Sequence, residues 1–278
     1  MTVGVEVQEN SPLGIIAGGG ELPRAVAFGA RAAGRGVFVV ALAGSTGAWA
    51  NDFPHAWGSM GQVGRTLRLL RRHGCKDVVF AGYVRRPNFF KLRYDLKGLS
   101  WFPPVLWAMR KGDNTLLDAM AGLFEREGLH IASIDSVAPW LQIPPGPLGA
   151  VAPTPQDESD IAVALAAARL QGSRDVGQAV IVRDGKVLAI EGRDGTDAML
   201  ARLGPQPAGR GVLVKALKPI QNRKSDLPTI GAATVRNAAA IGLAGIAVEA
   251  HTALVLDKEA VAAAADALGL FVTAVPAP

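Results

Sequence analysis

Short apolar runs alternate with amphipathic segments in the first half of the chain. The apolar runs have the length of strands, and the segments between them carry hydrophobic positions at helical spacing. Strands that alternate with helices form parallel βαβ units, so this half is predicted to be a doubly wound, Rossmann-like α/β sheet. The predicted strands are residues 13–17, 37–42, 77–81 and 129–134, and the predicted helices are residues 22–33, 63–70 and 114–127.

Prolines mark the middle of the chain. Six of them fall between residues 139 and 155, a density that disfavours helices and central strands. We therefore predict a Rossmann-like domain over residues 13–137, a Pro-rich linker over 138–156 and a distinct C-terminal mixed α/β domain over 157–278.

The second half has a different pattern. Asp184-Gly185 stands between two apolar runs, 179–182 and 186–190, and predicts a β-hairpin because both turn positions favour positive φ. A helix is predicted over residues 157–170, with Thr154 or Gln156 near its N-cap and acids in its first turn. Further helices are predicted at 197–203, 233–241 and 258–268, and further strands at 211–216, 246–249, 254–256 and 270–273.

Composition narrows the class of protein. Hydrophobic residues make up 49% of the chain, which suits packed cores and excludes a disordered protein. No run reaches the roughly 18–20 apolar residues of a membrane span, and Glu6 and Glu9 argue against a secretory signal. Cys75 is the single cysteine, so no internal disulfide is possible. We expect a cytoplasmic protein.

Basic and aromatic residues are concentrated between residues 85 and 111. Seven Lys or Arg residues there face one acid, Asp95, and six aromatic residues lie among them. Such a segment binds nucleic acid, rests on an anionic membrane surface or lines a pocket for an amphiphile. The alternative is a loop and helix packed by the aromatic residues, with their charges in water. The net charge of +5 favours an anionic partner without naming one.

Three glycines follow the first predicted strand. Gly18, Gly19 and Gly20 stand where doubly wound folds bind phosphate, because glycines allow close backbone approach and the next helix offers free N–H groups. The alternative is a tight turn. The second predicted strand runs into residues 41–45, which contain no acid to hold a nicotinamide ribose, so a dehydrogenase is disfavoured.

An acidic run follows the predicted hairpin. Glu191, Asp194 and Asp197, with Thr196, offer the hard oxygen ligands that Mg²⁺ or Mn²⁺ prefers. Polar residues at the exit of a hairpin are also common without a metal. Both interpretations stay open from the residues alone.

The segment from Lys215 to Gly231 carries the richest chemistry. It follows a predicted buried strand, at the end where open α/β sheets place their sites. Its cations Lys215, Lys218 and Arg223, the amide of Gln221 and the carboxylate of Asp226 suit phosphoryl transfer. Cations neutralise phosphate oxygens, and an acid orients water or holds a metal. A solvated basic loop is the alternative.

Five ordered motifs resemble one family, the LpxI-type UDP-2,3-diacylglucosamine pyrophosphatases of lipid A biosynthesis. The resemblance runs from Leu13 through nearly the whole chain, and the order of five motifs makes it specific. The motifs are Ile16-Ala17-Gly18-Gly19-Gly20 with Leu22-Pro23, residues 111–117 (KGDNTLL), residues 175–180 (DVGQAV), residues 194–200 (DGTDAML) and the Lys215 to Gly231 stretch with Asp226-Leu227-Pro228.

The resemblance implies an activity and a set of site residues. It implies a Mg²⁺- or Mn²⁺-dependent hydrolase that cleaves UDP-2,3-diacylglucosamine to UMP and 2,3-diacylglucosamine 1-phosphate (lipid X), with water attacking the β-phosphorus and substrate between two domains. Asp226 is then essential, and with Glu191 and Asp197 it is our predicted metal set. Lys215, Lys218 and Arg223 are the predicted catalytic cations on the diphosphate. The predicted substrate contacts are Gly18, Gly19, Gly20, Leu22, Asp113, Thr115, Gln178, Thr196 and Gln221.

Two other classes of function were weighed. A non-catalytic regulator that binds a nucleotide or lipid is the main alternative, and it predicts UDP binding without turnover. A nucleic-acid-binding protein that uses residues 85–111 is disfavoured, and we expect no nucleic-acid partner. We also expect a homodimer, and docking of the basic-aromatic segment at the cytosolic surface of the inner membrane.

Overall fold

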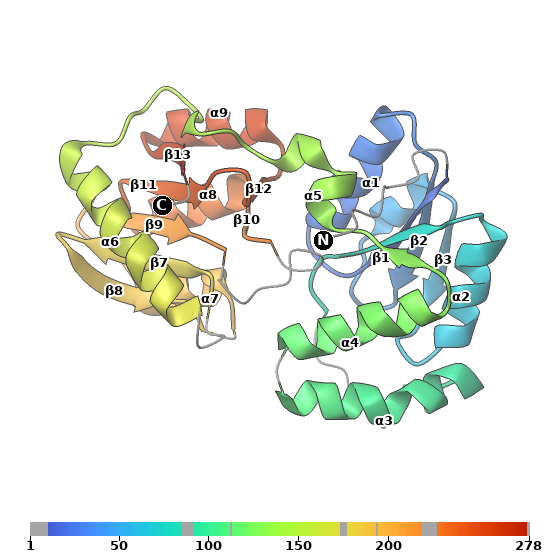
Figure 1. Ribbon diagram of the computed structural model, residues 1–278. Helices are drawn as coiled ribbons and strands as arrows, with labels where there is room; N and C mark the ends of the chain where they lie inside the picture. The colour runs from blue at the N-terminus through green and yellow to red at the C-terminus, as the bar shows by residue number, and fades with distance from the viewer. Residues whose placement is uncertain are drawn as a thin grey trace, which may run out of the picture. The chain divides into compact units, whose positions relative to one another are not determined.

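The computed structural model describes residues 11–84, 92–111, 113–172, 177–192, 194–217 and 227–276 (Figure 1). The chain divides into two compact units, with the boundary between Pro139 and Trp140. Each unit has its own sheet and its own hydrophobic core. The α/β architecture with two distinct sheets agrees with the predicted fold class.

The first unit is built on a five-stranded parallel sheet in the order β3-β2-β1-β4-β5. The order reverses at β1, which is the topology of a doubly wound fold. The edge strand β3 was not among the predicted strands. The strands are β1 (Leu13–Ala17), β2 (Val37–Leu42), β3 (His55–Gly58), β4 (Asp77–Ala81) and β5 (His130–Ile131).

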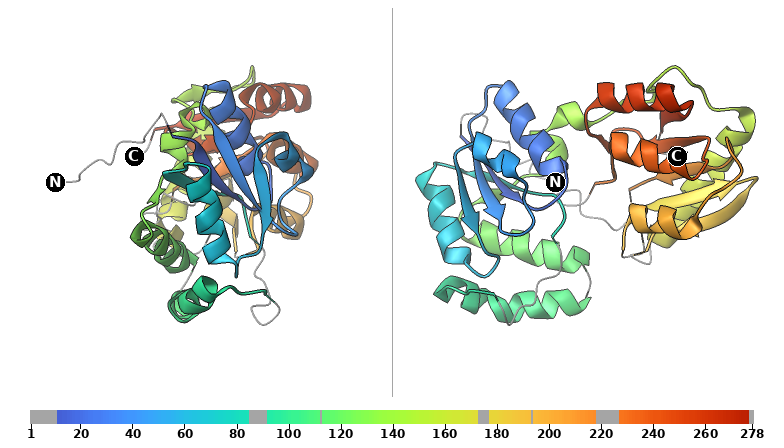
Figure 2. Two further views of the ribbon diagram at one scale, coloured as in Figure 1. Left: turned by 90° about the vertical axis from the view of Figure 1, so that its right-hand side faces the viewer. Right: turned by 180° about the vertical axis from the view of Figure 1, so that it is seen from behind.

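Helices cover both faces of this sheet. On one face, α1 packs against β1, β2 and β4, and the short α5 packs against β4 and α1. On the other face, α2 and α4 contribute to a core with Leu67, Phe124 and Ile131, and α3 packs on α2 and α4. Figure 2 shows the same arrangement from two further directions. The helices are α1 (Leu22–Ala32), α2 (Val63–Arg72), α3 (Leu96–Lys111), α4 (Asp113–Arg126) and α5 (Ile134–Val137), and a 3₁₀ turn spans Ala48–Asp52.

The base of this sheet contains a buried ion cluster. Asp77 is 1% exposed, accepts from Arg35 at 2.6 Å and contacts Nδ1 of His130 at 2.8 Å. A buried carboxylate needs such partners, and they join the start of β4 to β5 and to the turn after α1. Cys75 lies close by in the chain, and burial raises the pKa of its thiol to about 11. The thiol is therefore protonated and inert at neutral pH.

The second unit is built on a six-stranded mixed sheet in the order β6-β13-β11-β9-β7-β8. Strands β13, β11 and β9 are parallel, whereas β7 runs antiparallel to β9 and forms a hairpin with β8. A separate parallel pair joins β10 to β12. The strands are β6 (Gly146–Pro147), β7 (Ala179–Arg183), β8 (Lys186–Ile190), β9 (Val212–Lys215), β10 (Thr229–Ile230), β11 (Gly245–Glu249), β12 (Leu254–Val255) and β13 (Phe271–Val275).

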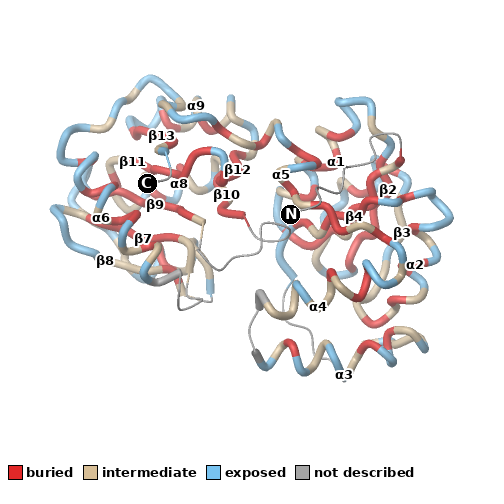
Figure 3. The backbone as a smooth tube through the Cα atoms, in the orientation of Figure 1, coloured by how far each residue is buried: buried red, intermediate tan, exposed pale blue. Residues whose placement is uncertain are grey.

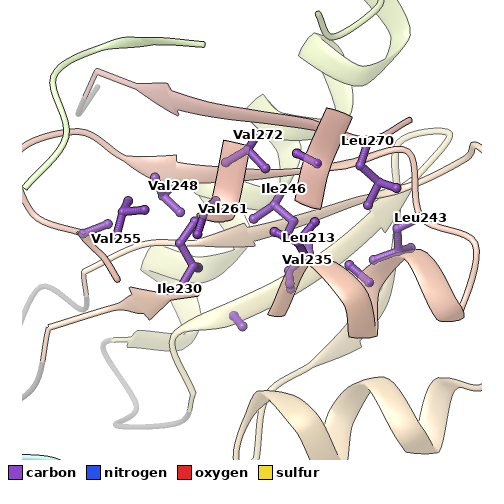
Figure 4. Packing of buried hydrophobic residues seen from close by; sticks show 14 of the residues in the cluster. Leu213, Ile230, Val235, Leu243, Ile246, Val248, Val255, Val261, Leu270 and Val272 are labelled. Atoms are coloured by element: carbon purple, nitrogen blue, oxygen red, sulfur yellow. The ribbon is translucent and has the colours of Figure 1, made fainter. Parts of the chain in front are cut away.

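Two helical layers enclose this sheet. Helix α6 packs Ile161 and Leu165 on one face, against Val182 and Val214. Helices α7, α8 and α9 cover the other face, where Val235 and Val261 pack on the strands (Figure 4). The four helices are α6 (Pro155–Gly172), α7 (Thr196–Leu203), α8 (Ala232–Ala240) and α9 (Lys258–Leu268). Among the described residues, no helix is long and apolar enough to cross a membrane.

The predicted hairpin and helix cap form as the sequence indicated. Asp184 and Gly185 have φ of 52° and 72°, and their N–H groups donate to the buried carboxylate of Asp160 at 2.9 and 2.7 Å. At the start of α6, Thr154 Oγ1 and the carboxylate of Asp157 exchange hydrogen bonds with each other's backbone N–H groups. This capping box fixes where α6 begins.

The Pro-rich segment contributes structure to the second unit. Residues 140–156, which we predicted as linker, lie in that unit, and β6 within them pairs antiparallel with β13. Pro147 occupies an edge strand, where a missing N–H costs no ladder hydrogen bond inside the sheet.

Candidate functional site

In the first unit, the glycine loop lies at the carboxyl end of β1. The N–H of Gly18 donates to Ala81 O at 2.8 Å, and the N–H of Gly19 donates to Tyr83 O at 2.7 Å. A Cβ on Gly18 would lie 2.4 Å from that Tyr83 oxygen, and one on Gly19 would lie 2.8 Å from the Tyr83 ring. The glycines thus admit the backbone that follows β4. Two of the three glycine amides are therefore used within the fold, and phosphate binding by this loop stays a prediction.

The other three predicted contacts of the first unit lie on helices. Leu22 is the first residue of α1 and is half-buried. Thr115 is half-buried in the first turn of α4, and the backbone of Asp113 begins that helix. The side chain of Asp113 lies outside the described part of the chain.

In the second unit, four strands bring polar residues to one edge of the sheet. Strand β7 is antiparallel to β9, so the start of β7 lies beside the end of β9, with Ala179 opposite Lys215. The carboxyl ends of β8 and β11 lie at the same edge. Gln178, Glu191, Lys215 and Glu249 are therefore neighbours in the fold although they span seventy residues of sequence. We call these four residues, together with Thr196, the carboxyl-edge cluster.

Glu191 joins two motifs at this edge. One carboxylate oxygen accepts from the N–H groups of Gln178 and Ala179 at 2.6 and 3.1 Å. The other accepts from the hydroxyl of Thr196 at 2.7 Å. Gly177 packs so closely that a Cβ there would lie 2.1 Å from the Glu191 carbonyl oxygen. Both carboxylate oxygens of Glu191 are therefore engaged in holding the start of β7 to the start of α7.

Lys215 is buried at the end of β9. Its Nζ donates to the carbonyl oxygen of Thr229 at 3.0 Å, which ties β9 to the start of β10. The N–H of Leu254 holds Pro228 O at 2.8 Å. Hydrogen bonds thus hold the backbone at residues 228–229, which follow the other predicted catalytic residues in the chain. Lys215, which precedes those residues, supplies one of these bonds.

The described carboxylates do not form a metal site. Glu191 makes the three hydrogen bonds given above, and Asp197 is exposed and accepts from Asn237 at 2.9 Å. Within the described ranges, no group of three or more His, Cys, Asp or Glu side chains is placed to hold an ion. Asp226, the third predicted ligand, lies outside those ranges.

Each unit matches the model of a known protein family. Residues 12–141 match the family described as the LpxI N-terminal domain, and residues 144–273 match the LpxI C-terminal domain. The chain belongs to the LpxI family. It is 46% identical over 271 residues to UDP-2,3-diacylglucosamine pyrophosphatase LpxI of Caulobacter vibrioides, covering 95% of this chain and 97% of that protein. The resemblance inferred from five motifs is confirmed.

The fold brings some predicted residues of this LpxI-family chain together and leaves others apart. Gln178 and Thr196, from separate motifs, meet at Glu191, and Lys215 is on the neighbouring strand. Gly18, Gly19, Gly20, Leu22 and Thr115 belong to the first unit. Lys218, Gln221, Arg223 and Asp226 fall outside the described residues, so their roles stay predictions.

Glu249 is a member of the cluster that sequence reasoning missed. It ends β11, is 5% exposed, accepts from the N–H of Leu217 at 2.9 Å and contacts Arg169 at 3.4 Å. It therefore holds the backbone immediately before Lys218. A signal was present in the sequence, because an acid that ends a buried parallel strand lies at the edge where such sheets place their sites.

Proposed function

We propose that this protein hydrolyses the pyrophosphate bond of UDP-2,3-diacylglucosamine, giving UMP and 2,3-diacylglucosamine 1-phosphate. The observation that carries the proposal is the 46% identity over nearly the full length to an enzyme of that name. The clustering of residues from three family motifs, those of Gln178, Thr196 and Lys215, at one edge of the second sheet supports it.

The reaction is a displacement at phosphorus by water. Oxygen from water forms a bond to the β-phosphorus, the bond from that phosphorus to the bridging oxygen breaks, and the bridging oxygen leaves with UMP. Lys218 and Arg223 are proposed to neutralise the diphosphate, and Asp226 to orient the water. Glu191 and Glu249 are proposed to act by holding backbone at this edge of the sheet. Lys215, the third predicted cation on the diphosphate, donates to Thr229 O, so we propose that it also holds backbone.

We also propose that the reaction depends on a divalent ion. Mg²⁺ or Mn²⁺ would neutralise charge on phosphate oxygens. The predicted ligand set includes Asp226, which lies outside the described residues, so we assign no step to the ion. Chelation tests the dependence directly: we expect turnover to fall to background in excess EDTA and to return with Mg²⁺ or Mn²⁺.

The first experiment is turnover of UDP-2,3-diacylglucosamine in detergent micelles, with UMP measured by chromatography. In ¹⁸O-labelled water, attack at the β-phosphorus places the label on the sugar phosphate and leaves UMP unlabelled. Binding of UDP with no UMP release, at any metal concentration, would favour a non-catalytic regulator. Label in UMP would place the attack at the α-phosphorus instead.

The assembly and location of the protein complete the proposal. A cytosolic enzyme that meets its acylated substrate at the inner membrane fits the basic-aromatic segment of the sequence. A homodimer remains our expectation, and light scattering on the purified protein measures it.

A further inference from the structure

Helix α3 exposes an apolar face. The positions of α3 that lie exposed are spaced as one side of a helix, and most of them carry no polar group. Leu96 is 89% exposed, Leu99 59% and Trp107 58%. Three of the nine large hydrophobic side chains exposed among the described residues thus lie on this one helix. The face comprises Leu96, Leu99, Ser100, Pro103, Pro104, Trp107 and Arg110.

The opposite side of α3 is the one that packs on the protein. Trp101 is 6% exposed and stacks edge-on against Phe124 of α4, with ring centroids 5.3 Å apart, and Ala108 is fully buried. Asp95 caps the helix by accepting from the N–H of Gly98 at 2.8 Å, and it also accepts from the N–H of Arg65 in α2. The helix is therefore anchored on one side, and buried and exposed residues alternate along it (Figure 3).

The exposed charged side chains that the structure describes on α3 and on the neighbouring helix α2 are all basic. The segment Leu96–Lys111 contains no acidic residue. Arg93 precedes the helix and Arg110 ends the exposed face, and both are exposed. Helix α2, which packs on α3, adds exposed Arg65 and Arg68. Acids also lie near α3. Asp95, directly before the helix, accepts from backbone N–H groups, and Glu127 is paired with Lys97 and with Arg71. Asp118 and Glu125 are exposed on α4.

We propose that this face of α3 docks on the anionic surface of a lipid bilayer. The apolar side chains would enter the interface between headgroups and acyl chains, and the arginines would contact lipid phosphates. Ordinary solvent-facing helices carry charges on that side, whereas this helix carries Leu, Pro and Trp there. The choice of partner rests on the proposed function, because a substrate with two acyl chains resides in a bilayer.

The prolines fit this orientation. Pro103 and Pro104 lie inside α3 and are exposed. Each lacks an N–H group, so they interrupt the hydrogen bonding of the helix and keep the exposed face apolar.

Vesicle sedimentation tests the proposal. The full-length protein is mixed with vesicles of phosphatidylethanolamine and phosphatidylglycerol, and in parallel with vesicles of phosphatidylcholine alone. We expect binding to the anionic vesicles that weakens as salt is raised. The double variant Leu96→Gln, Leu99→Gln should bind about tenfold less or worse, because each leucine loses its transfer into the apolar layer.

A matched control removes exposed apolar side chains elsewhere. Val187 on β8 and Leu268 on α9 are 42% and 46% exposed. The double variant Val187→Gln, Leu268→Gln should bind vesicles as the unmodified protein does. Equal loss in both doubles, or unchanged binding in the α3 double, would overturn the assignment of the face.

A second measurement avoids dependence on the folding of the double variant. Trp107→Phe keeps an aromatic side chain at the same position. If the face enters the bilayer, brominated lipids quench the tryptophan fluorescence of the unmodified protein more than that of Trp107→Phe. Identical fractional quenching would contradict the proposal.

The oligomeric state of the Leu96→Gln, Leu99→Gln variant gives a further test. If this variant is a monomer where the unmodified protein is a dimer, and vesicle binding is unchanged, the face is an interface between two copies of the chain and the proposal is wrong.

Turnover separates this inference from the proposed function. In detergent micelles the α3 double should release UMP within about twofold of the unmodified rate, and in vesicles its rate should fall with its binding. Absence of UMP from the unmodified protein in micelles would count against the pyrophosphatase activity. Vesicle binding by α3 is tested separately, by the sedimentation experiment.

Discussion

The glycine loop of the first unit and the carboxyl-edge cluster of the second unit both lie where parallel strands of their sheet have their carboxyl ends, yet they are built differently. Gly18 and Gly19 are held by backbone hydrogen bonds, and the space for a side chain is filled by Tyr83. In the second unit, the side chains of Glu191 and Lys215 reach across the edge and hold backbone groups of other segments.

The first region therefore depends on the space available to its backbone, and the second depends on charged side chains. A loop held by its own backbone tolerates no added atoms but depends on no ionised group. An edge held by buried charged side chains tolerates small changes of volume. It loses stability when one charge is removed, because the remaining polar partners are left buried without a hydrogen bond. We therefore expect the two regions to respond to different substitutions.

The largest effect is expected from Asp226→Ala in the second unit. If this acid orients water, UMP release should fall about 10²-fold to 10³-fold with binding of UDP retained, since the interaction acts in the transition state. Initial rates and isothermal titration with UDP measure the two quantities. A rate within a few fold of the unmodified enzyme would remove Asp226 from the chemistry. Glu259→Gln, at an exposed acid of α9 that belongs to none of the five motifs, is the control.

Next in size is Glu191→Ala, which removes the acceptor for three hydrogen bonds. The N–H groups of Gln178 and Ala179 lose their partner, and we expect a loss of roughly 2–4 kcal/mol in the free energy of unfolding. Urea denaturation measures it. Turnover should fall together with order at this edge. If the free energy of unfolding is unchanged while metal affinity falls, Glu191 is a metal ligand and does not serve to hold the backbone at this edge.

The glycine loop is tested by Gly18→Ala. Its Cβ would lie 2.4 Å from the Tyr83 oxygen, so backbone must move, and we expect a loss of about 1–3 kcal/mol in the free energy of unfolding. Gly122 in α4 is the matched control, because a Cβ there meets nothing within 4 Å. Gly122→Ala should be neutral or stabilise by roughly 0.4–1 kcal/mol. Equal effects of the two substitutions would contradict the packing role of Gly18.

The smallest effect is expected at Asp95, where the first unit also uses a carboxylate to hold backbone. Burial raises the pKa of Asp95, but the N–H groups of Gly98, Arg65 and Gly64 outweigh it and hold that pKa below its usual value. A lowered folded-state pKa contributes stability above the unfolded pKa of about 3.9, and this is lost as pH falls through the folded pKa.

Asp95→Asn replaces one carboxylate oxygen with an NH₂ group, so one of the N–H groups of Gly98 and Arg65 loses its acceptor. We therefore expect a cost of about 1 kcal/mol at neutral pH. The difference from the unmodified protein should shrink below pH 4. Thermal unfolding at a series of pH values checks this, with the exposed Asp52→Asn as control. A difference that stays constant down to pH 2 would show that ionisation of Asp95 is not its cause.

The sequence predicted most of the elements because hydrophobic periodicity is a local property. The strands at 13–17, 37–42 and 77–81 were assigned to the residue, as was the Asp184-Gly185 turn. The missed elements were of two kinds. One is the sixteen-residue helix α3, which was not among the predicted helices and which contains Pro103 and Pro104, residues that disfavour a helix interior. The others have few residues and little periodicity. β3 is a four-residue edge strand and β10 has two residues, so neither carries a pattern long enough to read.

The candidate site was predicted less completely, and for a physical reason. The motifs around Gln178, Thr196 and Lys215 were found because they stand in a specific order with two further motifs along the chain. Glu191 was assigned to a metal from its residue type, whereas its hydrogen bonds to Gln178, Ala179 and Thr196 depend on the antiparallel entry of β7. Glu249 was missed because its partner Leu217 is thirty-two residues away in the chain.

The amino-acid sequence by itself determined the two α/β halves, the family and the residue types available for pyrophosphate chemistry, because these depend on local patterns and on motifs. Only the tertiary structure decided what those residues touch. The glycine amides of residues 18 and 19 bind backbone, the Glu191 carboxylate joins two segments, and α3 turns its apolar side outward. Each of these depends on which strands and helices become neighbours, which is set by packing over the whole unit rather than by any local pattern.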